Sequence, residues 1–311
     1  MTMLNPNRRQ WLGATSSAFA ALLASGAVAR ASSAAASGTS GPSYGPLVED
    51  PAGLIDLPQG FTYRVISSLG DAMDDGGTVP DHADGMGCFA LPDGEIALVR
   101  NHELTQKDDT GGPIAHGFGR CNGEFVAGGT TNIVLDAETL AVKRQFRSLG
   151  GTIRNCSGGI TPWGTWLSCE EAPTGPGQKY GEGLEINHGW VFEVPADATG
   201  LVEAMPLRAM GRFNHEAACI DPETGIAYMT EDRDDGVIYR FIPAVPGDLA
   251  QGGRLQAMVI EGLTDRATGP ATNRPPLWPS GTITQCAGSI LMMSRRPRMI
   301  CACALRLLVL H

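Results

Sequence analysis

One pattern recurs three times in the middle of this chain and restricts the folds that it can adopt. In each copy a polar cluster leads into a strand-length apolar run, a glycine-containing turn, a second such run and then one or two carboxylates. The copies recur about every 60 to 70 residues, a period that with β content is typical of propeller blades separated by long loops. They start at Asp84, Asn155 and Asn214, turn at Asp93-Gly94, Trp163-Gly164 and Thr224-Gly225, and end at Glu103, Glu171 and Asp232.

Strand signals continue outside the three copies, whereas no helical heptad is convincing. The 41 glycines and 21 prolines of the 311 residues indicate many turns and favour an all-β architecture. Strands are predicted at residues 61–66, 95–99, 131–135, 189–194 and 237–241, which are rich in β-branched or aromatic residues. We therefore predict an all-β propeller; an ordinary β-sandwich with unrelated hairpins is the alternative.

The first residues have the layout of a signal peptide. Arg8 and Arg9 precede a weakly apolar run over residues 13–29, and small residues follow at Ala27, Ala29 and Ala31. We predict a twin-arginine signal over residues 1–31, recognised by the twin-arginine translocation machinery, and export to the periplasm or beyond the cell. The alternative, a membrane anchor, needs a longer and more apolar run, so no stable membrane span is expected.

The remaining chain divides by composition. Residues 32–44 are predicted to be a Ser/Ala/Gly linker, and residues 45–276 to form the propeller domain. The tail over residues 277–311 is basic, and no Asp or Glu follows Asp265 in this acidic chain. We expect a truncated or out-of-frame ending, which would leave the propeller incomplete; a genuine but unusual C-terminal segment is the alternative.

The charge of the chain excludes one class of partner and favours another. The formal net charge is −10 and the pI about 5.1, and no basic stripe is visible, which argues against nucleic acid as a partner. The same charge suits a protein that binds cations. Equivalent strand ends in a propeller point toward one axis, so Glu103, Glu171 and Glu231 are predicted to converge. Like charges in one site repel each other unless a cation neutralises them, and carboxylate oxygens are the ligands that hard cations prefer. Alternatively, these carboxylates simply face solvent.

Cys156 is the most informative of the eight cysteines. It precedes Ser157-Gly158-Gly159, a loop that lets backbone approach a ligand closely. A thiolate beside carboxylates indicates a transition metal, with iron or zinc as candidates; the alternative is a small buried residue. His102 and His215 each precede a Glu, and adjacent side chains on a strand point to opposite faces. We favour Glu103 and Glu216 as the members that face the site.

Anion-binding groups are also predicted. Residues 128–132 offer backbone N–H groups, hydroxyls and the Asn132 amide in a tight loop, which suits phosphate. Arg154 and Arg212 stand just upstream of site candidates, where a guanidinium can bind an oxyanion. The chain has no Walker motif and no Gly-x-Ser-x-Gly element, which argues against a P-loop enzyme and a serine hydrolase.

Taken together, several motifs resemble the PhoX family of secreted bacterial alkaline phosphatases. The most specific stretch is Gly151-Thr152-Ile153-Arg154-Asn155-Cys156-Ser157-Gly158-Gly159-Ile160-Thr161-Pro162-Trp163-Gly164-Thr165-Trp166-Leu167, continuing to Cys169-Glu170-Glu171. The other stretches are residues 79–86, 98–103, 128–132, 211–216 and 228–232, and the similarity covers about residues 45–245.

The resemblance implies a β-propeller that holds iron and calcium and hydrolyses small-molecule phosphate monoesters. It implies that Cys156 binds iron, that Glu171, Glu216 and Glu231 bind metal, and that Asn132 lies near the phosphate. The family's Arg-x-Glu-Gly element, expected after about residue 276, is absent, so an inactive fragment is one alternative. The others are a non-catalytic metal-binding propeller and a calcium-dependent lactonase or esterase.

Overall fold

The computed structural model describes residues 44–258. The predicted signal peptide, nearly all of the predicted linker and the predicted tail therefore lie outside the described residues. The chain divides into two compact units, residues 1–64 and residues 65–311, and each is considered by itself.

The described part of the first unit is a short hairpin. Strand β1 (Leu47–Val48) pairs with β2 (Leu57–Pro58) in antiparallel fashion. The Asp50 carboxylate accepts hydrogen bonds from the Tyr63 hydroxyl at 2.6 Å and from the backbone N–H groups of Ala52 and Leu54. These bonds, led by that of Tyr63, lower the pKa of Asp50 to about 2. The strand predicted at residues 61–66 does not form, because these residues pair with no strand in the described part of the chain.

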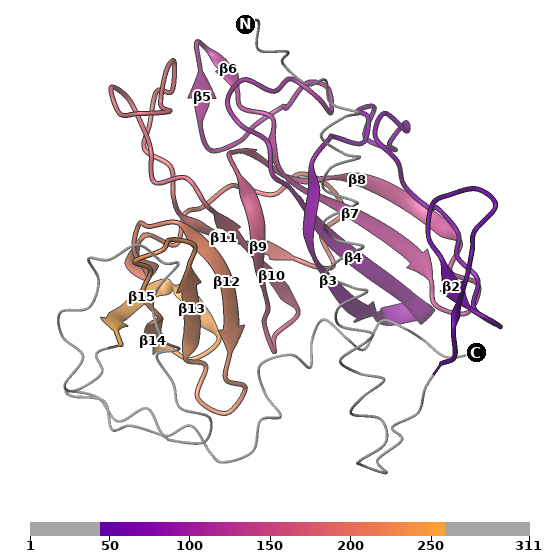
Figure 1. Ribbon diagram of the computed structural model, residues 1–311. Coiled ribbons are helices and arrows are strands. Elements are labelled where there is room, and N and C mark those ends of the chain that lie inside the picture. The colour runs from indigo at the N-terminus through magenta and orange to yellow at the C-terminus, as the bar shows by residue number, and fades with distance from the viewer. Residues whose placement is uncertain (1–43, 259–311) are drawn as a thin grey trace, which may run out of the picture. The chain divides into compact units, whose positions relative to one another are not determined.

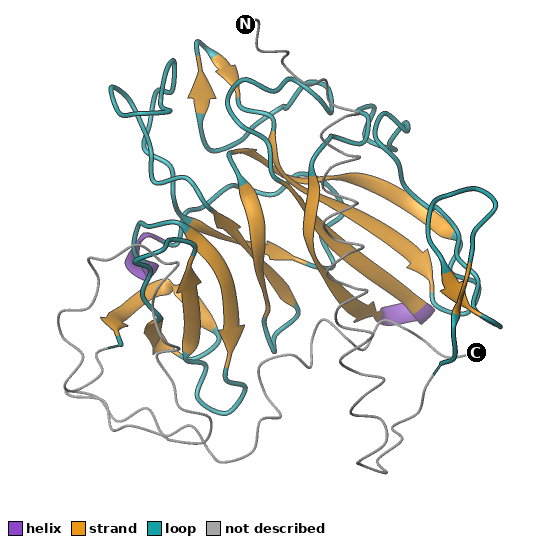
Figure 2. Cartoon of the chain, in the orientation of Figure 1, coloured by secondary structure: helices purple, strands orange, loops and turns teal. Residues whose placement is uncertain are grey.

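The second unit is built from antiparallel sheets (Figures 1 and 2). Its first sheet has the order β3 (Ala83–Leu91), β4 (Glu95–His102), β7 (Gly128–Asp136), β8 (Val142–Thr152). The second sheet joins β9 (Asn155–Ile160), β10 (Thr165–Glu170) and β11 (Val191–Pro195), and the third joins β12 (His215–Ile220), β13 (Ala227–Glu231), β14 (Tyr239–Val245) and β15 (Asp248–Ala257). A small hairpin of β5 (Arg120–Cys121) and β6 (Glu124–Phe125) lies between β4 and β7 in the chain. Within the described residues, the only helical elements are the 3₁₀ turns η1 (Pro92–Gly94) and η2 (Arg208–Met210).

The three sequence copies are the first hairpins of the three sheets. Strands β3 and β4 form the first, β9 and β10 the second, and β12 and β13 the third. The predicted turns at Asp93-Gly94, Trp163-Gly164 and Thr224-Gly225 connect the two strands of these hairpins. Of the other predicted strands, residues 131–135 lie in β7, and residues 189–194 and 237–241 overlap β11 and β14.

The first strands of the three sheets meet. Strand β9 contacts both β3 and β12, and it stands between them in Figure 1. The sheets also pack face to face. Phe89 and Val99 of the first sheet form a core with Phe192 of the second, and Leu167 of the second forms another with Met229 of the third. We call β3, β9 and β12 the inner strands. Propeller blades have this arrangement, in which the inner strands meet and the faces of neighbouring sheets enclose cores. The all-β prediction is confirmed, and among residues 44–258 the blades do not close into a ring, as expected for an incomplete propeller.

Glycines allow the inner strands to approach each other. A Cβ atom at Gly159 of β9 would collide with the carbonyl oxygen of Ala218 in β12, and one at Gly85 of β3 would lie 2.7 Å from the Cα atom of Ser157. Only glycine fits such close approaches of backbone to backbone. The Gly-Gly sequence after Cys156 therefore serves the packing of β9.

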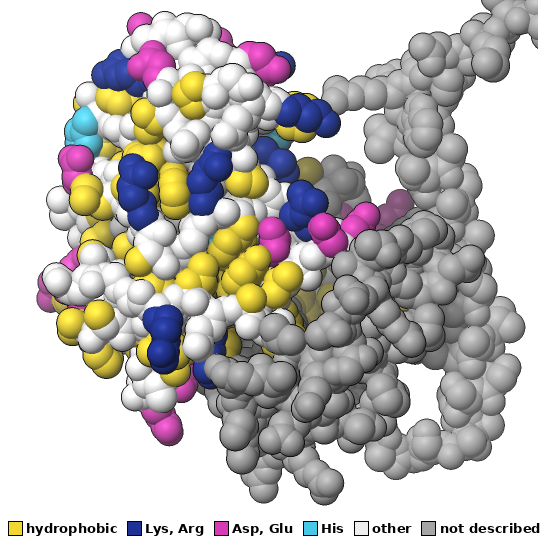
Figure 3. Space-filling model, turned by 90° about the vertical axis from the view of Figure 1, so that its left-hand side faces the viewer, with side chains coloured by type: hydrophobic (Ala, Val, Ile, Leu, Met, Phe, Trp, Pro, Cys, Tyr) yellow, Lys and Arg dark blue, Asp and Glu magenta, His cyan; other side chains and the backbone are white. Residues whose placement is uncertain are grey.

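Several Lys and Arg side chains lie across the middle of the face drawn in Figure 3. Lys and Arg side chains there are dispersed among hydrophobic and uncharged ones. In the part of the chain that the structure describes, no helix is long and apolar enough to cross a bilayer.

Candidate metal centre

An irregularity of strand pairing recurs at the same place in the three inner hairpins. In β3 the pairing register shifts between Ala83 and Met86, and in β12 it shifts between His215 and Ala218. In β9 it shifts near the start of the strand, opposite Ser168–Glu170 of β10. Each shift falls on the second residue of the inner strand or next to it, and such bulges re-aim side chains near sites. The residues at this second position are Asp84, Cys156 and Glu216, and those directly after the second strand are Glu103, Glu171 and Asp232. Because the hairpins are antiparallel, all six lie at the same end of their hairpins.

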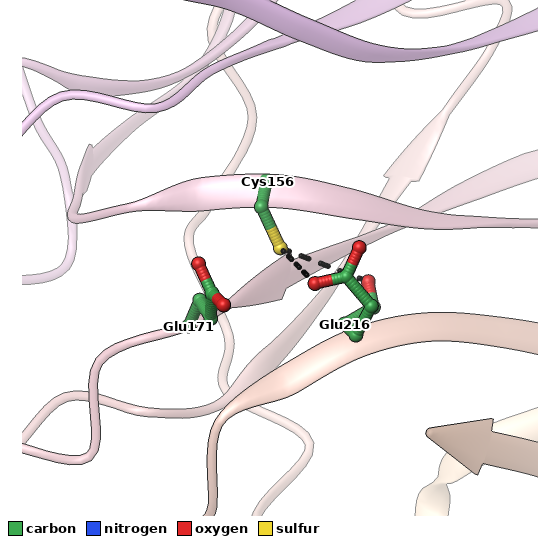
Figure 4. Close-up of side chains that lie close together, drawn as sticks. All are labelled: Cys156, Glu171 and Glu216. Atoms are coloured by element: carbon green, nitrogen blue, oxygen red, sulfur yellow. Dashed lines mark hydrogen bonds between the residues drawn. The ribbon is translucent and has the colours of Figure 1, made fainter. Parts of the chain in front are cut away.

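Three of these six side chains come together closely. The Cys156 sulfur and carboxylate oxygens of Glu171 and Glu216 all lie within 4.8 Å of one another. Figure 4 shows Cys156 reaching from β9 toward the two carboxylates, which approach from opposite sides. The sulfur lies 3.5 Å from Oε2 of Glu216, and Cys156 and Glu171 are buried. We call these three residues the thiol–carboxylate cluster.

The remaining acids surround this cluster, together with one arginine. Arg154 donates from Nη2 to Glu171 at 2.6 Å, and from Nε and Nη2 to Glu103 at 3.1 and 3.0 Å. Asp84 forms a hydrogen bond with Glu103, and Asp232 forms one with Glu171. Five carboxylates thus form one connected group, of which two bond to the guanidinium, and the group carries a surplus of negative charge.

Burial and the charges of neighbouring carboxylates shift Glu171, Glu216 and Asp84 toward their protonated forms. Burial, followed by the hydrogen bond with Asp232, raises the pKa of Glu171 to about 8, although Arg154 opposes the shift. Burial is also the main cause that raises the pKa of Glu216 and of Asp84, with nearby carboxylates adding to it. Burial and the charge of Glu216 raise the pKa of the Cys156 thiol well above its usual range. A multivalent cation reverses this balance, because it stabilises the ionised forms of its ligands.

The donor set fits a metal ion. One sulfur and two carboxylates within 4.8 Å combine a soft ligand with hard ones, which suits a transition metal rather than calcium alone. The outer acids Asp84, Glu103 and Asp232 offer oxygen only, the donor that calcium prefers.

The predicted site residues meet with different outcomes. Cys156, Glu171 and Glu216 are brought together, and Glu103 and Arg154 lie beside them. Glu231 does not belong to the cluster, because its Oε2 accepts hydrogen bonds from the Tyr239 hydroxyl at 3.1 Å and from the backbone of Val237. It is the last residue of β13, so its side chain points to the opposite face from that of the next residue. Asp232 takes the position that was predicted for Glu231.

Asn132 is not brought to the cluster either. Its side chain is fully buried in β7 and its amide donates to the carbonyl oxygen of Ala196 at 3.1 Å, so it faces the interior rather than the cluster. Arg212 also has a structural position: it bonds to the carbonyl oxygens of His188 and Thr174. The guanidinium holds the long loop between β10 and β11.

The two histidines point inward, as strand alternation predicts. His102 bonds to the carbonyl oxygen of Asp81 and to the hydroxyl of Thr131, both at 2.9 Å. His215 bonds to the carbonyl oxygen of Gly211 and lies against the ring of Phe213. Both imidazoles are fully buried, which leaves the neighbouring glutamates at the site.

Sequence reasoning missed Asp84 and Asp232 as site residues. Both stood in the recurring pattern, Asp84 at the start of the first copy and Asp232 at the end of the third. Aligning the copies on their last residue, rather than on glutamate as a residue type, would have found Asp232.

The sequence matches the family described as Alkaline phosphatase PhoX over residues 42–274. Among solved structures the chain is similar to Pseudomonas fluorescens PhoX in complex with vanadate, a transition state analogue, with 20% sequence identity and a TM-score of 0.49. The match covers 66% of this chain and 53% of that chain, so this chain spans about half the length of that relative. No curated protein sequence matches the chain significantly. The family match extends over most of the chain, and the chain belongs to the PhoX alkaline phosphatase family.

Proposed function

We propose that this chain is an exported, metal-dependent phosphatase that hydrolyses small-molecule phosphate monoesters in the periplasm or outside the cell. One observation supports the metal dependence above all others: a cysteine thiol and two carboxylates from two different blades lie within 4.8 Å of one another. Membership of the PhoX family supports the reaction, and the Arg8-Arg9 leader supports export.

In this proposal the metals divide by ligand type. Cys156, Glu171 and Glu216 bind iron, because a thiolate is a softer ligand than calcium prefers. Glu103, Asp84 and Asp232 contribute oxygen ligands to calcium. When bound, multivalent cations neutralise phosphoryl oxygens and place the attacking oxygen.

Arg154 is the residue proposed to contact the phosphate. Its side chain is 41% exposed, so it can be reached from solvent while it remains bonded to Glu103 and Glu171. A guanidinium donates pairs of hydrogen bonds to phosphoryl oxygens. The two glutamates fix its orientation and leave other N–H donors for the ester.

The test is the hydrolysis of p-nitrophenyl phosphate by the full chain, loaded with iron and calcium, with iron content measured in parallel. We expect hydrolysis that a chelator abolishes and that calcium restores once iron is bound. Bound iron without hydrolysis would instead support the non-catalytic metal-binding function. Calcium-dependent hydrolysis of a lactone by a chain without iron would support the lactonase function, since such a site needs no thiolate ligand.

A further inference from the structure

The side-chain amide of Asn101, in the first sheet, forms hydrogen bonds to residues of the second sheet, one of which is Cys156 of the thiol–carboxylate cluster. It is fully buried near the end of β4. Its Nδ2 donates to the carbonyl oxygens of Cys156 at 3.2 Å and Ser157 at 2.8 Å. Its Oδ1 accepts from the indole of Trp166 and from the hydroxyl of Ser168, both at 2.9 Å. A side-chain amide offers two donors and two acceptor sites, and all four are used.

The two carbonyl groups that Asn101 binds belong to an irregular part of the strand. The pairing of β9 with β10 shifts register between Ser168 and Glu170, so Cys156 and Ser157 fall outside the regular ladder. On its other side β9 pairs with no strand among residues 44–258, where it is the last strand of its sheet. A buried carbonyl without a partner is destabilising by roughly 1 to 3 kcal/mol. Asn101 supplies the donors that a neighbouring strand would otherwise provide.

The residue before Cys156 is held by the same network. The amide of Asn155 donates to the Ser168 hydroxyl at 2.9 Å, and the Thr152 hydroxyl donates to Asn155 at 2.7 Å. These polar groups are all fully buried. A fully satisfied buried network fixes one conformation, because any shift breaks several bonds in a medium of low dielectric constant.

We propose that Asn101 is a positioning residue that holds the irregular segment of β9 so that the Cys156 sulfur faces Glu216 and Glu171. The inference rests on the proposed metal centre, since the ligand that Asn101 positions is the thiolate of that centre. Outer partners of metal ligands typically change metal affinity 10- to 100-fold when they are removed. Asn101 would act in this way through the backbone rather than through the ligand side chain.

The experiment compares the full chain with Asn101→Asp and with Thr130→Val. The Asp variant keeps the acceptor for Trp166 and Ser168 but turns an oxygen toward the two carbonyl groups. Thr130 pairs with Asn101 in the neighbouring strand, is also fully buried and bonds to Ser148, so its variant controls for the loss of a buried polar contact. Cobalt(II) serves as the probe, because a bound thiolate gives a charge-transfer band in the near ultraviolet. Hydrogen exchange of residues 155–158, without added metal, reports the strand itself.

We expect Asn101→Asp to weaken cobalt binding at least tenfold, to reduce the band and to speed exchange at residues 155–158, while Thr130→Val leaves all three near the values of the parent chain. If the Asp variant does not fold, Asn101→Ser, which also loses both donors, is measured in its place. Unchanged cobalt affinity and exchange in a folded Asn101 variant would overturn the proposal and leave the proposed function standing. A parent chain that shows no thiolate band would overturn both.

Discussion

The sulfur of Cys156 lies 3.5 Å from Oε2 of Glu216, although the two residues are 60 positions apart in the chain. They meet because β9 packs against β12, where Gly159 leaves room for the carbonyl group of Ala218. Burial raises the pKa of both groups, and the charge of Glu216 raises that of the Cys156 thiol further, although the hydrogen bond with Cys156 lowers the pKa of Glu216. A cation bound by both groups would stabilise the ionised form of each. This contact is therefore where the proposed metal site can be tested most directly.

Replacing Cys156 by Ser should abolish iron binding. The hydroxyl is a poor ligand at neutral pH, so the substitution removes the soft donor and leaves the carboxylates in place. Elemental analysis of the purified chain measures the effect, with Cys121→Ser as the control because Cys121 is not part of the cluster. An iron content in Cys156→Ser equal to that of the parent chain would refute the assignment.

Arg154→Met should destabilise the chain without bound metal. The substitution removes the guanidinium that bonds to Glu103 and Glu171 and leaves their repulsion uncompensated, so we expect a loss of about 1–2 kcal/mol in the free energy of unfolding. Urea denaturation at low ionic strength measures it. The exposed pair of Arg233 and Asp235 is the control, and Arg233→Met should change stability by less than about 0.5 kcal/mol. Equal effects of the two substitutions would contradict the prediction.

Gly159→Ala should destabilise the fold by about 1–3 kcal/mol, since the new methyl group would collide with the carbonyl oxygen of Ala218. The same collision should push β9 away from β12 and weaken metal binding. Thermal unfolding checks the first effect and a cobalt titration the second. Gly200→Ala is the matched control, because a Cβ atom there has nothing within 4 Å. A Gly159→Ala chain as stable as Gly200→Ala would show that the strands are not so close.

The buried His102 should make the chain sensitive to acid. Burial lowers the pKa of His102 to about 3 in the folded chain, whereas an unfolded chain protonates this group near the ordinary value of 6.5. Between these values the unfolded state binds more protons, so the free energy of unfolding decreases as the pH falls from 6.5 toward 3. Urea denaturation across this range should show a shallower decrease for His102→Gln than for the parent chain. Parallel curves would argue against a neutral buried imidazole.

Much of the architecture could be predicted from the sequence because it follows from local patterns. The turns at Asp93-Gly94, Trp163-Gly164 and Thr224-Gly225 lie between strands that can be recognised from their β-branched and aromatic residues. The alternation of side chains along a strand also separated Glu103 and Glu216 from the histidines beside them. The strand expected at residues 61–66 failed for the opposite reason: a β-branched and aromatic run forms a strand only where a partner strand is available, and no local signal reports that.

The site could be predicted in part. Cys156 and Glu171 belong to the most specific motif, whereas Glu231 was predicted from the recurrence of a glutamate near the end of each copy, and the structure places Asp232 against Glu171 instead. The side-chain period of a strand is two, so an error of one position moves the ligand to the wrong face. The position of Asn132 could not be predicted, because its amide bonds to Ala196 in another blade, a contact that no short motif encodes.

The register shift near the start of each inner strand fixes where a donor atom lies, but it does not fix which element that atom is. The backbone determines where the second residue of β3, β9 and β12 places its side chain. The residue type at that position determines whether the donor atom is oxygen or sulfur. Aspartate, cysteine and glutamate occupy the three places. A single substitution at one of these three positions would therefore change which metal ion the proposed centre prefers, while the backbone stays the same.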